Sequence, residues 1–301
     1  MPTSKGQSTL EVPAPAVAIR VAVLTSIAMM AFAANSILCR LALKNTSIDP
    51  ATFTSTRLAS GALALWVLLT FRQERQTLHY NWPSALALFG YAAAFSFAYV
   101  SLSAGTGALL LFGSVQATMI VTGLLRGERL SFAAGLGLAL ALGGLMALVA
   151  PGVEAPPTMG SLLMIMAGSA WGLYSLRGRH SADPVLATTS NFLLAVPMAL
   201  VINGIYIPWA NFDPQGLLWA MLSGTLASGM GYILWYAVLP KLTSTRAAVV
   251  QLSVPVLAAL GGIAFLGERL TLRLVVSAAV TLSGIALVII SKSSSAQTKS
   301  T

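Results

Sequence analysis

Charged residues are scarce in this chain: Asp, Glu, Lys and Arg make up only 8% of its 301 residues, whereas 56% are hydrophobic. A soluble globular protein has about 25% charged residues, so the composition excludes an ordinary water-soluble domain. The mean hydropathy of +0.82 indicates instead a polytopic membrane protein. The chain also has no long polar segment in which a separate catalytic domain could fold.

Cysteine and histidine are equally scarce. The single cysteine, Cys39, excludes an internal disulfide and is expected to be a small buried hydrophobic residue. The two histidines, His79 and His180, fall near the ends of apolar segments. The sequence contains no His-Glu-x-x-His motif, no intramembrane aspartate pair and no Ser–His or Cys–His arrangement. It therefore predicts no enzyme, no metal site and no cofactor.

Acidic residues are absent from the interiors of the apolar segments. All eight fall in tails, loops or segment ends: Glu11, Asp49, Glu74, Glu128, Glu154, Asp183, Asp213 and Glu268. Proton-coupled carriers usually keep an Asp or Glu inside the membrane. We therefore expect facilitated diffusion or exchange rather than proton antiport through an embedded carboxylate; sodium coupling through backbone carbonyls stays open.

Apolar runs long enough to cross a bilayer, about 20 residues each, fill the rest of the chain. We predict ten spans: Ile19–Cys39, Thr52–Phe71, Pro83–Ser103, Gly105–Leu125, Phe132–Val149, Gly160–Leu176, Leu186–Ile205, Leu217–Leu239, Arg246–Leu266 and Leu272–Ile290. Residues 1–18 and 291–301 are predicted to be polar tails, the first of them disordered.

Basic residues flank the spans rather than forming a patch, which excludes a nucleic-acid partner despite the net charge of +9. With the N-terminus inside, twelve of the 17 Lys and Arg residues fall on the side of the termini and four on the other, with Arg57 inside a span. The positive-inside rule therefore predicts that both termini are cytoplasmic.

An internal repeat is the most informative pattern. Gly127-Glu128-Arg129-Leu130 recurs 140 positions later as Gly267-Glu268-Arg269-Leu270, and Asp49-Pro50 in the first half matches Asp183-Pro184 in the second. The repeats are predicted to occupy residues 19–150 and 160–290, joined by a loop at 151–159. Because each holds five spans, the second copy is inverted in the membrane. This organisation is typical of secondary transporters, whose site lies at the repeat interface.

Three stretches resemble one known family: Ala104-Gly105-Thr106-Gly107-Ala108, the paired Gly-Glu-Arg-Leu motifs, and Ala170-Trp171-Gly172-Leu173-Tyr174-Ser175. They resemble the drug/metabolite transporter superfamily, in its ten-helix branch with twin EamA repeats, over nearly the whole chain between the tails. Within that branch the chain looks most like the YddG-type exporters of aromatic amino acids.

The resemblance implies an all-α integral membrane protein in the bacterial inner membrane, with ten helices as two inverted five-helix repeats around a central cavity. It also implies alternating access and export of amino acids or other metabolites. One departure is that the family's frequent Trp-Gly near the first span is Ala33-Ala34 here. Any role for that tryptophan therefore rests on Trp171.

Polar and aromatic side chains inside the spans are the candidate substrate contacts. Buried amides and hydroxyls need a partner or a wet cavity, and aromatic walls suit a flat apolar substrate. The candidates are Asn35, Phe95, Tyr99, Gln116, Trp171, Tyr174, Trp235, Gln251 and Ser253. The alternatives are hydrogen bonds between helices for the polar residues, and lipid-facing packing or an interfacial belt for the aromatic ones.

Four further residues are candidates for gating or structure. Arg57 inside the second span meets a substrate carboxylate, snorkels, or makes a structural hydrogen bond to nearby carbonyls. Glu128 and Glu268 form either a gate latch or caps of the helix that follows each motif. Pro255 allows a kink in the ninth span.

The sequence thus predicts a carrier of small amphipathic metabolites, with aromatic or other neutral amino acids as the leading class. The alternative is a channel or lipid-translocating protein. The expected partners are a small-molecule substrate and the lipid bilayer, with a monomer favoured.

Overall fold

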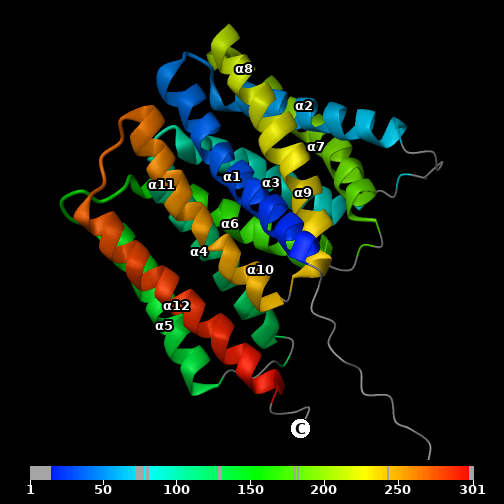
Figure 1. Cartoon of the computed structure of the whole chain (residues 1–301). Helices are drawn as coiled ribbons and strands as arrows, with labels where there is room; N and C mark the ends of the chain where they lie inside the picture. Colours follow the sequence, from blue (N-terminus) through cyan, green and yellow to red (C-terminus); the bar gives the residue numbers. More distant parts are fainter. Residues whose placement is uncertain are drawn as a thin grey trace, which may run out of the picture.

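The computed structural model describes residues 15–71, 78, 81–125, 127, 131–178, 181, 183–242 and 244–297, and every regular element in these ranges is a helix. The first half contains α1 (Pro15–Asn45), α2 (Pro50–Thr70), α3 (Trp82–Tyr99), α4 (Ala104–Leu125) and α5 (Phe132–Val149). The second half contains α6 (Thr158–Gly178), α7 (Pro184–Tyr206), η1 (Ile207–Trp209), α8 (Pro214–Leu222), η2 (Ser223–Met230), α9 (Gly231–Val238), η3 (Leu239–Lys241), α10 (Ser244–Gln251), α11 (Ser253–Leu266) and α12 (Leu272–Gln297). Figure 1 shows them as one bundle.

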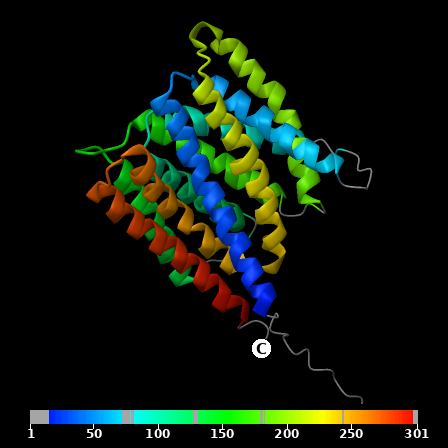
Figure 2. The ribbon, with the colours of Figure 1, turned by 45° about the horizontal axis from the view of Figure 1, so that its top comes forward.

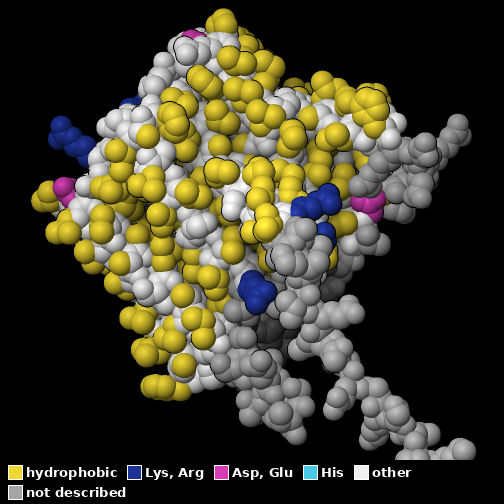
Figure 3. Space-filling view, in the orientation of Figure 1, with side chains coloured by type: hydrophobic (Ala, Val, Ile, Leu, Met, Phe, Trp, Pro, Cys, Tyr) yellow, Lys and Arg dark blue, Asp and Glu magenta, His cyan; other side chains and the backbone are white. Residues whose placement is uncertain are grey.

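Hydrophobic side chains cover the outside of this bundle. On the face shown in Figure 3 they extend across the middle of the molecule, and few Lys, Arg, Asp or Glu side chains interrupt them. Nine segments of the described ranges are long and apolar enough to cross a membrane. The predicted span that is not among them is α3, which packs against α2, α6 and α7. The predicted fold class, an all-α integral membrane protein, is confirmed.

Matching aspartates begin α2 and α7, as the repeat predicts. The Asp49 carboxylate accepts hydrogen bonds from the amides of Ala51 and Thr52, each 2.9 Å long. The Asp183 carboxylate does the same for Val185 and Leu186 at 3.0 Å. Each aspartate precedes a proline, which has no amide proton to satisfy in the first helical turn. The Asp-Pro pairs are therefore equivalent helix starts in the two halves.

The helix ends and two of the spans differ from the prediction. Helix α1 begins at Pro15 and α12 runs to Gln297, so both extend into the segments predicted as tails. The ninth span is two helices with a turn at Leu252, because Pro255 has no N–H to donate to the carbonyl of residue 251. The eighth span contains a π-helical segment, η2, in a run of small residues.

Equivalent helices of the two halves lie side by side. Helix α5 packs against α12, α2 against α7, and α4 against α11, while the contact of α3 with α6 is matched by that of α1 with α8 and α9. Figures 1 and 2 show the α5–α12 pair along one side of the bundle. Close approach depends on glycine there, because a Cβ atom on Gly284 would lie 2.5 Å from the carbonyl oxygen of Gly137. This pairing is the one expected of two repeats related by a two-fold axis.

Candidate functional site

A cavity of about 400 Å³ lies at the interface of the two halves. Its inner part is lined by the middle of α1, α3, α4 and α6. From there it extends to the end of the bundle where α1 begins and α12 ends, called here the terminal face (Figure 1). Gly178, Pro184 and Pro240 line that outer part. The volume is that of a small-molecule site.

Aromatic rings form a continuous wall in the inner part. The ring of Trp171 stacks on that of Tyr232, with centroids 5.0 Å apart and planes at 29°. It also lies 4.8 Å from Tyr91, which contacts Phe95 at 5.4 Å. The wall therefore joins α3, α6 and α9, and its flat faces suit an aromatic or other planar apolar group.

The polar groups that line the cavity are amides, hydroxyls and the ring N–H groups of tryptophan. Asn35, Gln116 and Gln251 line it from α1, α4 and α10, and no Asp, Glu, Lys or Arg of the described residues does so. Such a lining can donate to a carboxylate and accept from an ammonium group, but it offers no full charge to either.

The structure brings together six of the nine predicted contact residues: Asn35, Phe95, Gln116, Trp171, Trp235 and Gln251 line the cavity. Tyr174 is buried behind the wall, with its ring 5.4 Å from that of Trp171. Tyr99 is buried nearer the other end, where its hydroxyl donates to the carbonyl of Ala104.

Ser253 lies away from the cavity. It is exposed and its hydroxyl donates to the carbonyl of Val250. Ser253 follows Gln251 by two residues, and side chains at that spacing point to opposite faces of a helix. With Gln251 facing the cavity, Ser253 therefore faces away from it.

The candidate set from the sequence left out several wall residues, chiefly Tyr91, Tyr232 and Phe32. Tyr91 stands four residues before Phe95 and Tyr232 three before Trp235, so each shares a helix face with a candidate. They were set aside in favour of aromatic residues further from the span ends. Phe32 stands three residues before Asn35 and carries the same kind of signal.

A buried polar network connects the first three helices to η2. Arg57 is 2% exposed; its Nη2 donates to the hydroxyl of Tyr91 at 2.9 Å and its Nε to that of Ser228 at 3.3 Å. Asn35 donates to the same Tyr91 hydroxyl at 3.1 Å and accepts from Ser223 at 2.7 Å. Arg57 therefore neither snorkels nor bonds to backbone carbonyls; it contacts side chains at the inner end of the cavity.

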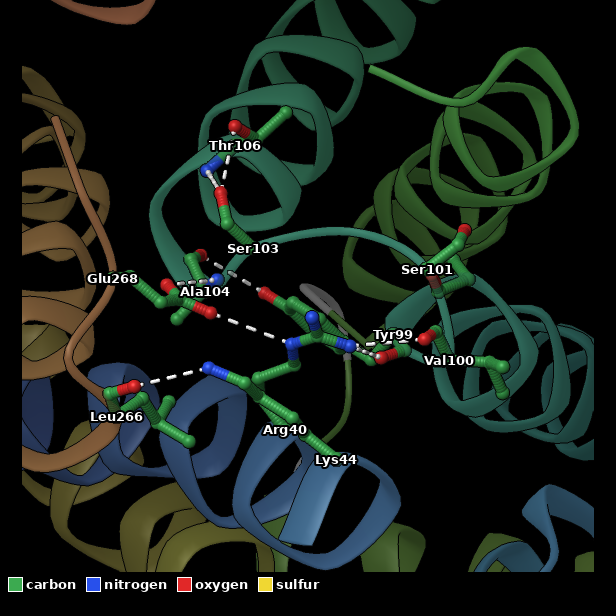
Figure 4. Close-up of polar contacts among 11 residues, drawn as sticks. Arg40, Lys44, Tyr99, Val100, Ser101, Ser103, Ala104, Thr106, Leu266 and Glu268 are labelled. Atoms are coloured by element: carbon green, nitrogen blue, oxygen red, sulfur yellow. Dashed lines mark hydrogen bonds and ion pairs between the residues drawn. The ribbon is translucent and has the colours of Figure 1, made fainter. Parts of the chain in front are cut away.

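A second polar cluster closes the end opposite the terminal face (Figure 4). The Glu268 carboxylate pairs with Arg40 at 3.3 Å and accepts from the amide of Ala104 at 2.8 Å. Arg40 also donates to the carbonyls of Tyr99 and Val100 at the end of α3. Lys44 donates to the carbonyl of Leu266 at the end of α11, at 3.0 Å. The cluster thus joins α1, α3 and α4 of the first half to the second half.

The expectation that each motif glutamate caps the helix after it is wrong for Glu268. Thr271 caps α12, since its hydroxyl accepts from the amide of Leu274 at 3.1 Å. Ser131, the equivalent residue of the first copy, caps α5 in the same way. Glu268 is therefore free to bind the N-terminus of α4, in the other half. Glu128 lies outside the described residues.

Comparison with known proteins agrees with this architecture. A model of the EamA-like transporter family matches residues 19–150 and, a second time, residues 158–290. The uncharacterized protein PA1977 of Pseudomonas aeruginosa is 54% identical over 90% of this chain and 94% of its own length. An uncharacterized transporter of Archaeoglobus fulgidus is 25% identical, covering 88% of this chain and 95% of its own.

Two more distant matches are consistent with these. The uncharacterized transporter YoaV of Bacillus subtilis is 22% identical over 79% of this chain and 86% of its own length. A crystal structure of a protein superposes with a TM-score of 0.58 at 20% identity, covering 87% of this chain and 98% of the other. The latter match concerns the fold alone.

Proposed function

The chain belongs to the EamA-like transporter family, with two EamA repeats, and we propose that it exports small amphipathic metabolites, with aromatic or other neutral amino acids as the leading class. Membership makes it a multi-pass membrane transporter with a small-molecule substrate. The substrate class, the direction and the location in the bacterial inner membrane are our proposal.

The observation that carries the proposal is the cavity at the repeat interface. Its wall of Tyr91, Phe95, Trp171 and Tyr232 presents flat apolar faces, and the amides beside it offer hydrogen bonds. An aromatic amino acid presents the matching groups, one ring and two polar substituents. Each ring-on-ring contact is worth about 0.5–1.5 kcal/mol beyond the burial of its area.

The absence of acidic side chains among the described lining residues supports transport that is not driven by an embedded proton-binding carboxylate. Substrate then moves down its own gradient or exchanges with another molecule. A transport rate that rises steeply with an imposed pH gradient across liposomes would contradict this part of the proposal.

Alternating access is supported by the unequal ends of the molecule. The cavity reaches the terminal face, whereas the cluster of Arg40, Ala104 and Glu268 closes the opposite face. We infer that this is the inward-open state, since the positive-inside rule makes the terminal face cytoplasmic. In the outward-open state the contacts of Glu268 would be broken.

Counterflow in proteoliposomes tests the function directly. Vesicles are loaded with unlabelled phenylalanine, tryptophan or threonine, and uptake of the same labelled amino acid is followed without an ion gradient. A carrier gives transient accumulation of label, because unlabelled substrate inside occupies the inward-facing site and competes with the label for exit. Flux that does not saturate and shows no counterflow would indicate a channel or a lipid-translocating protein instead.

Two variants locate the site. Trp171→Ala and Gln251→Ala should each reduce accumulation, by about tenfold for the loss of roughly 1.4 kcal/mol of binding. Trp66→Ala and Gln215→Ala are the matched controls, because both side chains are exposed on the outside of the bundle. Equal losses in the controls would show that the first pair acts on folding.

A further inference from the structure

Arg57 has no counter-ion in the part of the chain that the structure describes. No acidic side chain among the described residues pairs with it, and its Nη1 atom is buried without a hydrogen-bond partner in the same part of the chain. The rings of Tyr91 and Phe95 lie against the guanidinium, with centroids 5.2 and 4.9 Å from Cζ. Aromatic faces attract a cation but do not neutralise it. A full positive charge is therefore buried within the membrane behind the wall of the cavity.

The hydroxyl of Tyr91 connects this charge to the cavity. Its oxygen accepts from Arg57 at 2.9 Å and from Asn35 at 3.1 Å. A phenolic oxygen has two acceptor positions and one proton to donate, so both acceptor positions are occupied. None of the described residues accepts the Tyr91 proton. Tyr91 lines the cavity, so an acceptor on a bound molecule is the partner that this proton lacks.

The charge of Arg57 favours one kind of acceptor for the Tyr91 proton. Donation from Arg57 polarises the Tyr91 O–H bond and strengthens it as a donor. The uncompensated guanidinium behind it favours an anion over a neutral or cationic group. At the same time no acidic side chain of the described lining is available to a substrate ammonium group.

From this geometry we propose that Tyr91, with Arg57 positioned behind it, binds the carboxylate of the substrate, and that the cavity selects aromatic carboxylates over aromatic amines. This inference rests on the proposed function and specifies its substrate. Tyr91 is the contact residue. Arg57 is a positioning residue that acts through Tyr91, and Asn35 holds the phenol from the other side.

Analogues that carry one polar group each test the proposal on the wild-type protein. Unlabelled 3-phenylpropionate keeps the carboxylate of phenylalanine and lacks the amine, whereas phenethylamine keeps the amine and lacks the carboxylate. In the counterflow assay 3-phenylpropionate should inhibit uptake of labelled phenylalanine at a concentration at least about tenfold lower than phenethylamine does, as expected for a hydrogen bond to a charged group. Equal inhibition by the two compounds would overturn the proposal.

Variants assign the preference to the two residues. Tyr91→Phe removes only the hydroxyl and should abolish the preference for 3-phenylpropionate, and Arg57→Met should do the same. Arg57→Lys keeps the charge and should restore part of the preference. The matched control is Tyr206→Phe, because Tyr206 lies outside the cavity and beside Trp209. This variant should keep the preference for 3-phenylpropionate. A merely structural role would lower transport in the presence of either analogue without changing their ratio, and that result would also overturn the proposal.

Failure of the proposed function is a separate outcome. If wild-type vesicles accumulate no amino acid, binding of the two analogues is measured instead through tryptophan fluorescence, since Trp171 and Trp235 line the cavity. Tighter binding of 3-phenylpropionate that is lost in Tyr91→Phe would support the carboxylate site even then. Equal affinities would overturn it.

Discussion

At the scale of single residues, Glu268 joins the two repeats at the closed end of the molecule. Glu268 meets both an arginine side chain and a helix N-terminus, and its side chain is only 10% exposed. Both contacts involve a charged group and are therefore stronger than neutral hydrogen bonds. Because Arg40 and Ala104 belong to the first repeat and Glu268 to the second, the proposed movement of one repeat against the other would break these contacts.

Replacing Glu268 with glutamine should favour the state that is open at the opposite face. The glutamine side chain can still accept a hydrogen bond from the amide of Ala104, but its ion pair with Arg40 is lost. This loss destabilises the closed end by about 1–2 kcal/mol. Opening of this end can be measured with the variant Ile37→Cys in a Cys39→Ser background, because Ile37 of α1 packs against Gly261 of α11. We expect Glu268→Gln to raise the rate at which an impermeant thiol reagent labels the cysteine at position 37 about tenfold.

The matched control is Glu154→Gln, which changes an exposed glutamate in the loop near the same end. Labelling of Ile37→Cys should be unchanged in this variant. If Glu268→Gln also left the rate unchanged, Glu268 would be a fixed structural contact and not part of a gate.

Among the helices, α5 and α12 form a contact that depends on small residues. Gly144 of α5 faces α12 so closely that an added Cβ atom would lie 2.8 Å from the backbone nitrogen of Thr281. An added Cβ on its neighbour Gly143 would meet no atom within 4 Å. The glycine pair is therefore one open position, Gly143, followed by one packing position, Gly144, because successive side chains on a helix point in different directions.

This difference predicts opposite results for two adjacent substitutions. Gly144→Ala should destabilise the protein by about 1–3 kcal/mol, because the backbones of α5 and α12 must move apart. Gly143→Ala should be neutral or slightly stabilising, because alanine favours the helix. Thermal unfolding of the purified protein in detergent measures both. Equal melting temperatures for the two variants would contradict the close contact.

For the whole molecule, the orientation of the cavity in the membrane decides from which side its substrate enters. The positive-inside rule predicts that both termini lie in the cytoplasm, and the cavity opens at the terminal face. The structure would then be an inward-open carrier. Movement between this state and its outward-open counterpart would exchange the roles of the two repeats, as inverted repeats allow.

Labelling from the two sides tests this orientation. In a Cys39→Ser background, Ser175→Cys, which lines the cavity, should react with an impermeant thiol reagent in inside-out vesicles and be protected by substrate. Ser47→Cys, exposed between α1 and α2, should react only in right-side-out vesicles. The reverse pattern would place the termini outside and refute the assigned direction.

The sequence by itself was sufficient for the fold class and for much of the cavity wall. Hydrophobic length decides which segments are helices in a membrane, because every backbone polar group there must be satisfied within its own segment. The mid-span amides Asn35, Gln116 and Gln251 could be selected because a polar side chain in hydrocarbon needs a partner. These are local properties, readable from one segment at a time.

Only the tertiary structure decided how residues from different segments meet. It placed Glu268 on the N-terminus of α4 rather than α12, and it joined Arg57, Tyr91 and Asn35 from three helices at one hydroxyl. It also left Ser253 outside the cavity, exposed and bonded to the carbonyl of Val250. The physical reason is that such contacts depend on the rotation and depth of each helix against its neighbours. Those are fixed by packing across the repeat interface and leave no periodic signal in the sequence.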